Sequence, residues 1–209
     1  IEESPSPAID EDTRRKMNEY AVLAAKTVGY TNAGTIEYIV DQKGGFYFME
    51  MNTRIQVEHG VTEMVTGTDL IIEQIRVAQG EALSFRQEDI EIRGHAIECR
   101  INAEIPAMNF MPSPGVVEHI HLPAGNGVRV DTALYGGYRI PSEYDSMIAK
   151  IIVHAPDRAA ALRKMSSALD ETVILGVETN LDFKYKIIKN PVFAAGEADT
   201  GFIEHIMKL

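Results

Sequence analysis

Two short stretches of alternating polarity, joined by a polar turn, constrain the fold of this chain more than any other feature. They span residues 34–40 and 48–52, and the segment between them carries aspartate, lysine and glycine. Alternation with a period of two is typical of half-buried strands, and such a connection is typical of a hairpin turn. If residues 43 and 44 form the turn, the strands pair antiparallel and Glu37 lies directly opposite Glu50. The same register pairs Thr35 with Asn52 and, on the face expected to be buried, Ile36 with Met51, Tyr38 with Met49 and Val40 with Tyr47.

The facing carboxylates of Glu37 and Glu50 predict a metal site. Two like charges directly opposite one another in a ladder repel, and a cation between them removes the repulsion. Asn52 adds an amide oxygen on the same face, and Mg²⁺ prefers oxygen ligands of this kind. A solvated strand edge is the alternative for Glu50 and Asn52, and a one-residue bulge in the turn would move Glu37 to the other face.

The segment after the second strand carries a polar side chain at every second residue. Arg54, Gln56 and Glu58 would point to one side of an extended segment. A guanidinium forms paired hydrogen bonds with a carboxylate-like or phosphate anion, and a nearby glutamate can accept its proton. The spacing therefore predicts a small-anion site with a candidate base beside it.

These residues resemble the ATP-grasp fold in the form found in biotin carboxylases. The resemblance rests on the run E-M-N-T-R-I-Q-V-E-H-x-V-T-E, which begins at Glu50, and continues through residues 93–104, 112–115 and 144–150. It covers essentially the whole chain. One departure is His59-Gly60, where the family usually has proline or threonine after the histidine, so we expect a looser backbone there.

The resemblance implies a ligand for each of these positions. It assigns ATP to Glu37, Ile39 and Glu50, and Mg²⁺ or Mn²⁺ to Glu37, Glu50 and Asn52. It assigns bicarbonate to Arg54, Gln56, the backbone of Val57, and Glu58, with Glu58 as the base. Biotin belongs to the same site, with Arg100 stabilising its enolate, so the implied catalytic set is Arg54, Glu58 and Arg100. In the implied reaction, bicarbonate attacks the γ-phosphate of MgATP to give carboxyphosphate, whose breakdown supplies CO₂ to biotin.

Spacing alone leaves the role of Arg100 open. Strand alternation over residues 95–102 predicts an apolar face with His95, Ile97, Cys99 and Ile101, and an opposite face with Ala96, Glu98, Arg100 and Asn102. Arg100 therefore faces away from the core, and a surface arginine paired with Glu98 or Glu104 is the alternative to a ligand-binding one. Cys99 is predicted to be an inert buried thiol.

The pattern of elements predicts an α+β fold. The resemblance assigns residues 1–92 to the C-terminal part of an ATP-grasp domain and residues 93–209 to a biotin carboxylase C-terminal domain, with a mostly antiparallel sheet packed by helices. Helices are expected at residues 11–28, 70–79, 157–169 and 180–190, the last one ended by Pro191. Further strands are expected near residues 116–122, 128–132 and 147–154. Glu73 is expected on the surface, as most charged residues are.

Charge and cysteine content limit the partners and the compartment. Twenty basic residues stand against 31 acidic ones, and the net charge of −11 disfavours nucleic acid and anionic membranes. The single cysteine excludes an internal disulfide and favours a reducing compartment. No apolar run approaches the length of a membrane span, so a cytoplasmic protein is expected.

The resemblance also implies partners and a larger protein. The chain would be the C-terminal half of an enzyme, nearly inactive by itself, that acts with a biotin carboxyl carrier protein and a carboxyltransferase. A homodimer would form through the C-terminal domain, where Arg129 and Asp145 lie. The biotin carboxylase component of acetyl-CoA carboxylase, in fatty acid synthesis, is the favoured assignment. The alternatives are another ATP-grasp ligase, such as carbamoyl-phosphate synthetase, and a non-catalytic dimerisation module.

Overall fold

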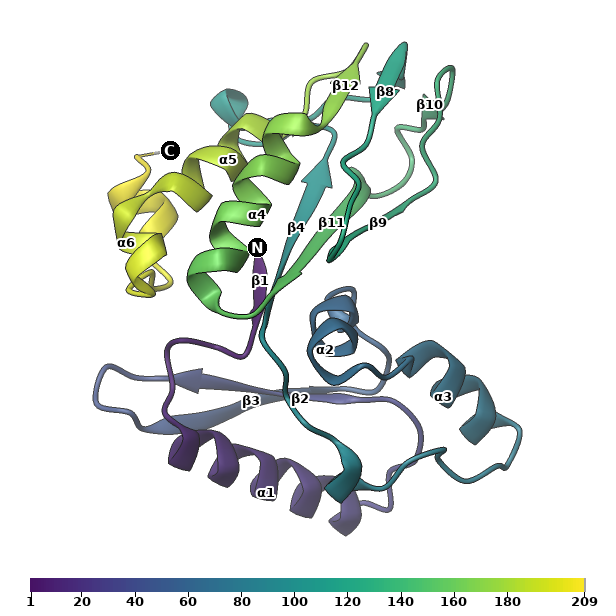
Figure 1. Ribbon diagram of the computed structural model, residues 1–209, viewed down its shortest axis with the longest axis vertical. Helices are drawn as coiled ribbons and strands as arrows, with labels where there is room; N and C mark the ends of the chain where they lie inside the picture. Colours follow the sequence, from purple (N-terminus) through teal and green to yellow (C-terminus); the bar gives the residue numbers. More distant parts are fainter. Residues whose placement is uncertain (209) are drawn as a thin grey trace. The chain divides into compact units, whose positions relative to one another are not determined.

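The computed structural model describes residues 1–208, which form two compact units (Figure 1). The first unit is Ser6–Ile92, and the second joins Ile1–Pro5 to the chain from Arg93 onward. Helices and mostly antiparallel sheets make up both, so the α+β prediction is confirmed. The first five residues belong with the second unit because strand β1 (Glu2–Ser4) pairs with β4 (His95–Asn102), a long-range contact that local sequence does not encode.

A helix and a hairpin form the centre of the first unit. Helix α1 (Glu11–Thr27) begins where the Asp10 side chain accepts a hydrogen bond from the backbone of Thr13 at 2.8 Å. Strands β2 (Thr35–Val40) and β3 (Phe46–Asn52) form the hairpin. The ring of Tyr38 packs edge-on against Phe46, and its hydroxyl donates to the carbonyl of Met17 in α1 at 3.2 Å. The unit continues with α2 (His59–Thr66), α3 (Leu70–Ala78) and a short 3₁₀ turn (Gln87–Asp89).

The hairpin register is confirmed for one half of the ladder and wrong for the other. Glu37 pairs with Glu50, and Thr35 and Ile36 pair as predicted, but next to the turn each residue pairs one position earlier, Tyr38 with Phe48. Met49 is therefore an extra, unpaired residue, and at 48% exposed it does not lie on a buried face as expected. The bulge lies beyond the turn, between the turn and the glutamate pair, so it keeps both glutamates on one face.

A four-stranded antiparallel sheet organises the second unit, in the order β1-β4-β11-β9. Strands β11 (Met147–Ala155) and β9 (Val128–Thr132) complete it. Helices α4 (Arg158–Glu171) and α5 (Leu181–Lys189) pack on one side, as Figure 1 shows. The core between them contains Ile97, Cys99 and Ile101 of β4, Ile151 and Val153 of β11, and Met165 and Leu169 of α4.

The remaining elements of the second unit are short. Three two-stranded ladders join β5 (Glu104–Ile105) to β6 (Met111–Pro112), β7 (Gly115–Val116) to β10 (Arg139–Ile140), and β8 (His119–His121) to β12 (Val173–Leu175). A 3₁₀ turn (Pro106–Met108), helix α6 (Pro191–Ala195) and a π-helical turn (Phe202–Ile206) complete the unit. No helix within residues 1–208 is both long enough and apolar enough to cross a membrane.

Four predicted helices are confirmed to within two residues at each end, and two helices were missed. The looser backbone expected at His59-Gly60 is wrong, because these two residues begin helix α2 and Gly60 is buried in it. Val61 and Val65 are buried as well, and Gly67 ends the helix in a left-handed conformation. Pro191 does not only follow α5. It also begins α6, where proline has no hydrogen bond to lose and the Asn190 side chain caps the helix.

The surface prediction for Glu73 is wrong. Its side chain is 9% exposed and accepts hydrogen bonds from the backbone and the hydroxyl of Ser84 at 2.9 and 2.6 Å. These bonds hold the pKa of Glu73 below its ordinary value. The carboxylate thus fixes the chain that follows α3, a role that helical spacing could not indicate.

Candidate functional site

The amide of Asn52 joins the two glutamates of the hairpin. Its nitrogen donates to Oε1 of Glu37 at 2.8 Å and to Oε1 of Glu50 at 2.9 Å. Both carboxylates therefore point to one side of the sheet and converge on one point. The predicted side-by-side arrangement of these three residues is confirmed, and their role as metal ligands stays a prediction.

The three side chains fit a hard divalent cation. One carboxylate oxygen of Glu37 and one of Glu50 lie within 2.9 Å of the amide nitrogen of Asn52. A half-turn of this amide would place its oxygen, which can bind a cation, where the nitrogen now lies. Mg²⁺ usually takes one or two protein carboxylates and completes its shell with phosphate oxygens and water. Across residues 1–208 no group of three or more histidine, cysteine, aspartate or glutamate side chains could hold a metal. An amide as third ligand is therefore consistent with a site completed by a substrate.

Arg54 and Gln56 extend this cluster. Nη1 of Arg54 donates to Oε1 of Gln56 at 2.6 Å, and Nε2 of Gln56 donates to Oε1 of Glu37 at 3.1 Å. Nη2 of Arg54 also reaches Oδ1 of Asn52 at 3.5 Å. The candidate anion fork and the carboxylates thus form one hydrogen-bond network, with the arginine exposed to solvent. Sequence spacing missed the bond between Gln56 and Glu37, since these residues meet only when the chain folds back.

The segment that carries the anion fork is not extended, so the predicted backbone conformation is wrong. The chain bends at Thr53 and Arg54 and turns at Val57 and Glu58, and Glu58 is the residue from which α2 begins. Val57 and Glu58 are half-buried, and the Glu58 side chain does not cap its own helix. The carboxylate is therefore placed by a helix terminus, which is more rigid than an extended loop.

Arg100 lies in the second unit, on β4. Its side chain is 34% exposed, and Nη2 forms an ion pair with Glu2 of β1 at 3.4 Å. Glu104, one of the expected partners, accepts hydrogen bonds from Ser146 and from the amide of Asn102. Arg100 thus points away from the helix-covered core, as predicted.

Two family models match separate parts of the chain. The family model of the biotin carboxylase C-terminal domain matches residues 98–205, and that of the ATP-binding domain of the carbamoyl-phosphate synthase L chain matches residues 1–86. This chain belongs to the biotin carboxylase family. It is 54% identical over 208 residues to biotin carboxylase of Nostoc sp. and 58% identical over 205 residues to biotin carboxylase 1 of Bacillus subtilis. It covers 46% of each of these proteins, so the chain spans about half the length of the curated relatives it matches.

Solved structures of the family match in fold as well as in sequence. The biotin carboxylase domain of a thermophilic 2-oxoglutarate carboxylase, bound to bicarbonate, superposes with a TM-score of 0.95 at 48% identity, covering 97% of this chain and 46% of that one. The corresponding dimer from Hydrogenobacter thermophilus, with MgADP and bicarbonate, gives 0.94 at 48% identity, covering 97% of this chain and 45% of that one. The biotin carboxylase subunit of pyruvate carboxylase also gives 0.94, at 46% identity, covering 97% and 45%.

Three predicted positions remain, and two of them, Arg129 and Asp145, have local partners. Arg129 binds Asp131 through two hydrogen bonds of 2.8 and 2.9 Å, and Asp145 accepts a bond from the backbone of Met147 at 2.8 Å. Ile39 is 57% exposed on β2. The dimer role of Arg129 and Asp145 and the nucleotide role of Ile39 stay predictions.

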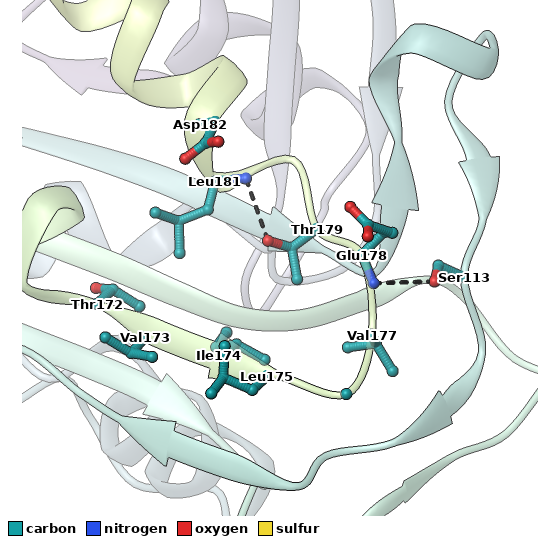
Figure 2. Close-up of a pocket in the computed structure, with 11 residues that line it drawn as sticks. Ser113, Thr172, Val173, Ile174, Leu175, Val177, Glu178, Thr179, Leu181 and Asp182 are labelled. Atoms are coloured by element: carbon teal, nitrogen blue, oxygen red, sulfur yellow. Dashed lines mark hydrogen bonds between the residues drawn. The ribbon is translucent and has the colours of Figure 1, made fainter.

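A hollow of about 600 Å³ in the second unit contains none of the predicted residues (Figure 2). It is lined by the connection between α4 and α5 and by Ser113, whose hydroxyl accepts a hydrogen bond from the backbone of Glu178 at 3.1 Å. Its charged lining residues are Glu178 and Asp182, and no basic side chain of residues 1–208 lines it. The hollow is therefore unsuited to bicarbonate or phosphate, both of which are anions.

Proposed function

We propose that this chain supplies the metal, bicarbonate and biotin-facing part of a biotin carboxylase that uses ATP. The observation that carries the proposal is the continuous network from Glu50 through Asn52 and Glu37 to Gln56 and Arg54. Two acids and an amide suit a cation, and the adjoining guanidinium suits a small oxyanion. The names of the relatives support the same reaction, and the match over residues 98–205 favours it over carbamoyl-phosphate synthesis.

Each residue has a defined task in the proposed reaction. Glu37, Glu50 and Asn52 would hold the cation, which would offset negative charge on the ATP phosphates when bound. Arg54 and Gln56, with the backbone of Val57, hold bicarbonate, and Glu58 accepts its proton so that the anion becomes a nucleophile. Ile39 contacts the nucleotide. Arg100 donates to the ureido oxygen of biotin as negative charge develops there.

Several finer assignments belong to the same proposal. Mg²⁺ or Mn²⁺ serves as the cation, and biotin is presented by a carboxyl carrier protein that a carboxyltransferase also uses. We favour acetyl-CoA carboxylase as the parent enzyme, in the cytoplasm, with a homodimer formed near Arg129 and Asp145. The relatives from Bacillus subtilis and Pseudomonas aeruginosa are named biotin carboxylase, and these names support biotin carboxylation without naming an acyl acceptor. A relative from Methanothermobacter thermautotrophicus is named as part of a pyruvate carboxylase, which makes pyruvate the competing acceptor.

Activity is best measured in a joined protein, in which this chain follows the N-terminal part that its relatives carry. Glu50→Gln keeps the shape of the side chain and removes its charge. We expect a loss of more than about 100-fold in bicarbonate-dependent ATP hydrolysis, because a metal contributes several kcal/mol to stabilising the transferring phosphoryl group. Glu19→Gln, on the exposed side of α1, is the matched control and should keep the parent rate. Equal rates for both variants would refute the metal site.

The acyl acceptor is tested separately. The joined protein is supplied with carrier and carboxyltransferase and offered acetyl-CoA, pyruvate or 2-oxoglutarate. We expect carboxylation of acetyl-CoA. If pyruvate or 2-oxoglutarate is carboxylated and acetyl-CoA is not, the assignment to acetyl-CoA carboxylase is wrong, whereas the proposed carboxylation of biotin still holds. The chain alone should hydrolyse ATP negligibly in the presence of bicarbonate.

A further inference from the structure

One face of the four-stranded sheet carries six charged side chains, three of each sign, which we call the charged face. It is the face opposite α4 and α5, because its residues alternate with the core residues along each strand. One row across the sheet runs from Arg100 through Lys150 to Asp131, and the neighbouring row runs from Glu2 through Glu98 and Ile152 to Arg129. The charged face therefore consists of Glu2, Glu98, Arg100, Arg129, Asp131 and Lys150.

Two of these charges are buried. Glu98 is 0% exposed and Lys150 is 8% exposed, whereas the side chain of Arg100 is 34% exposed. Removing an ion from water is costly unless an opposite charge lies close by. The ammonium of Lys150 lies 3.3 Å from Oδ2 of Asp131 and 3.9 Å from Oε2 of Glu98. Lys150 thus lies between two carboxylates.

Asp131 is held in its ionised form. Burial raises the pKa of Asp131, but the hydrogen bonds and charge of Arg129, together with Lys150, outweigh that effect and leave its pKa below the ordinary value. The charges thus continue across three strands from Arg129 through Asp131 and Lys150 to Glu98. Each partner restricts the position of the next.

Arg100 is the direct cross-strand neighbour of Lys150. Two cations opposite one another in a ladder repel, so Lys150 disfavours any position of the guanidinium towards β11. Glu98 lies two residues before Arg100 on the same face, and Lys150 and Arg100 are both attracted to its carboxylate. The repulsion by Lys150 and the ion pair with Glu2 together restrict the position of the Arg100 guanidinium.

We propose that Lys150 and Glu98 are positioning residues for Arg100. Their buried ion pair, with Asp131 behind it, holds the guanidinium at the place where it meets negative charge on biotin. This inference rests on the proposed role of Arg100. It predicts that the ion pair affects the transfer to biotin and leaves the reaction of ATP with bicarbonate unchanged.

The test uses the joined protein and two readouts, which are carboxylation of biotin and bicarbonate-dependent ATP hydrolysis without biotin. Lys150→Met keeps the length of the side chain and removes its charge. We expect kcat for biotin carboxylation to fall about 10- to 100-fold, since a misplacement of about 1 Å can cost that much. ATP hydrolysis and the KM for ATP should stay within about twofold. Lys150→Arg should restore most of the rate, and Lys186→Met, on the exposed side of α5, should have no effect.

Each result decides between the explanations. If Lys150→Met lowers both readouts equally, the pair is merely structural and the inference is wrong. If Arg100→Met leaves biotin carboxylation unchanged, the proposed role of Arg100 is wrong, whereas loss with Arg100→Met and no loss with Lys150→Met overturns the inference alone. Should Lys150→Met fail to fold, Glu98→Asp keeps every charge and moves one carboxylate. The same selective loss is then expected, and an unchanged rate overturns the proposal.

Discussion

Arg158 connects three parts of the second unit, and its removal should measurably weaken that unit. Its guanidinium donates to both oxygens of Glu3 in β1, at 2.7 and 3.1 Å, and to the carbonyls of Phe193 and Ala194 in α6, at 2.8 and 2.6 Å. The pair is largely buried, with side chains 18% and 15% exposed. Oε2 of Glu3 also lies 2.8 Å from Nε2 of His95.

The size of the effect follows from these contacts. Breaking a buried ion pair by removing one partner costs ~3–5 kcal/mol, because the other charge stays buried. Glu3 keeps His95 and some contact with water, which offsets part of that cost. We therefore expect Arg158→Met to lower the free energy of unfolding of the second unit by about 2–4 kcal/mol.

The measurement is urea unfolding of this chain followed by circular dichroism, with amide hydrogen exchange on β4 to report on the second unit by itself. Arg163→Met, on the exposed side of the same helix, is the control and should change the free energy by less than about 0.5 kcal/mol. Glu3→Gln combined with Arg158→Met should cost less than the two single changes added together, since both remove one interaction. A loss below about 1 kcal/mol, or the same loss in the control, would refute the role given to Arg158.

Three further predictions concern other positions. The pKa of Glu73 is lowered from 4.5 by its bonds to Ser84, so this glutamate stabilises the first unit above pH 4.5, and the contribution is lost as the pH falls through the lowered pKa. Ser84→Ala should remove most of that pH dependence in urea unfolding, and an unchanged profile contradicts it. Burial raises the pKa of Cys99 to about 11, so the native chain should not react with iodoacetamide at about pH 8, whereas the urea-unfolded chain should react at once. Gly176 has a φ of +99°, and a Cβ there would lie 2.2 Å from the carbonyl oxygen of Val116. Gly176→Ala should therefore lower the midpoint of urea unfolding by more than alanine substitutions at exposed positions do. An unaltered midpoint would contradict this.

The hairpin shows how far the sequence could predict the site. Alternation and a polar turn were enough to place Glu37 opposite Glu50. The register beside the turn was wrong because Asp41 shapes the connection. Its carboxylate accepts hydrogen bonds from the backbone of Lys43 and Gly45 at 2.8 and 2.9 Å, which makes the turn longer than two residues. The bulge at Met49 then restores the pairing of the glutamates, and no local pattern in the sequence requires it.

The segment from Arg54 to Glu58 shows a different limit. The residue types were sufficient to predict an anion site, because a guanidinium and a carboxylate keep their chemistry in any conformation. Their arrangement was not predicted, since the chain bends where an extended segment was expected and a helix begins at the next residue. Val61 and Val65 of α2 are buried, and local spacing does not indicate where that helix begins.

The sequence by itself determined the order and type of the longer elements, the identity of the reactive side chains and the family, because hydrophobic period and side-chain chemistry are local properties. The tertiary structure alone decided that β1 pairs with β4. It also decided that Glu98 and Lys150 are buried, on a face that alternation predicts to be polar. Alternation assigns a side chain to one face of a strand. Whether that face meets water depends on segments far away in the chain, whose approach is governed by packing and loop closure.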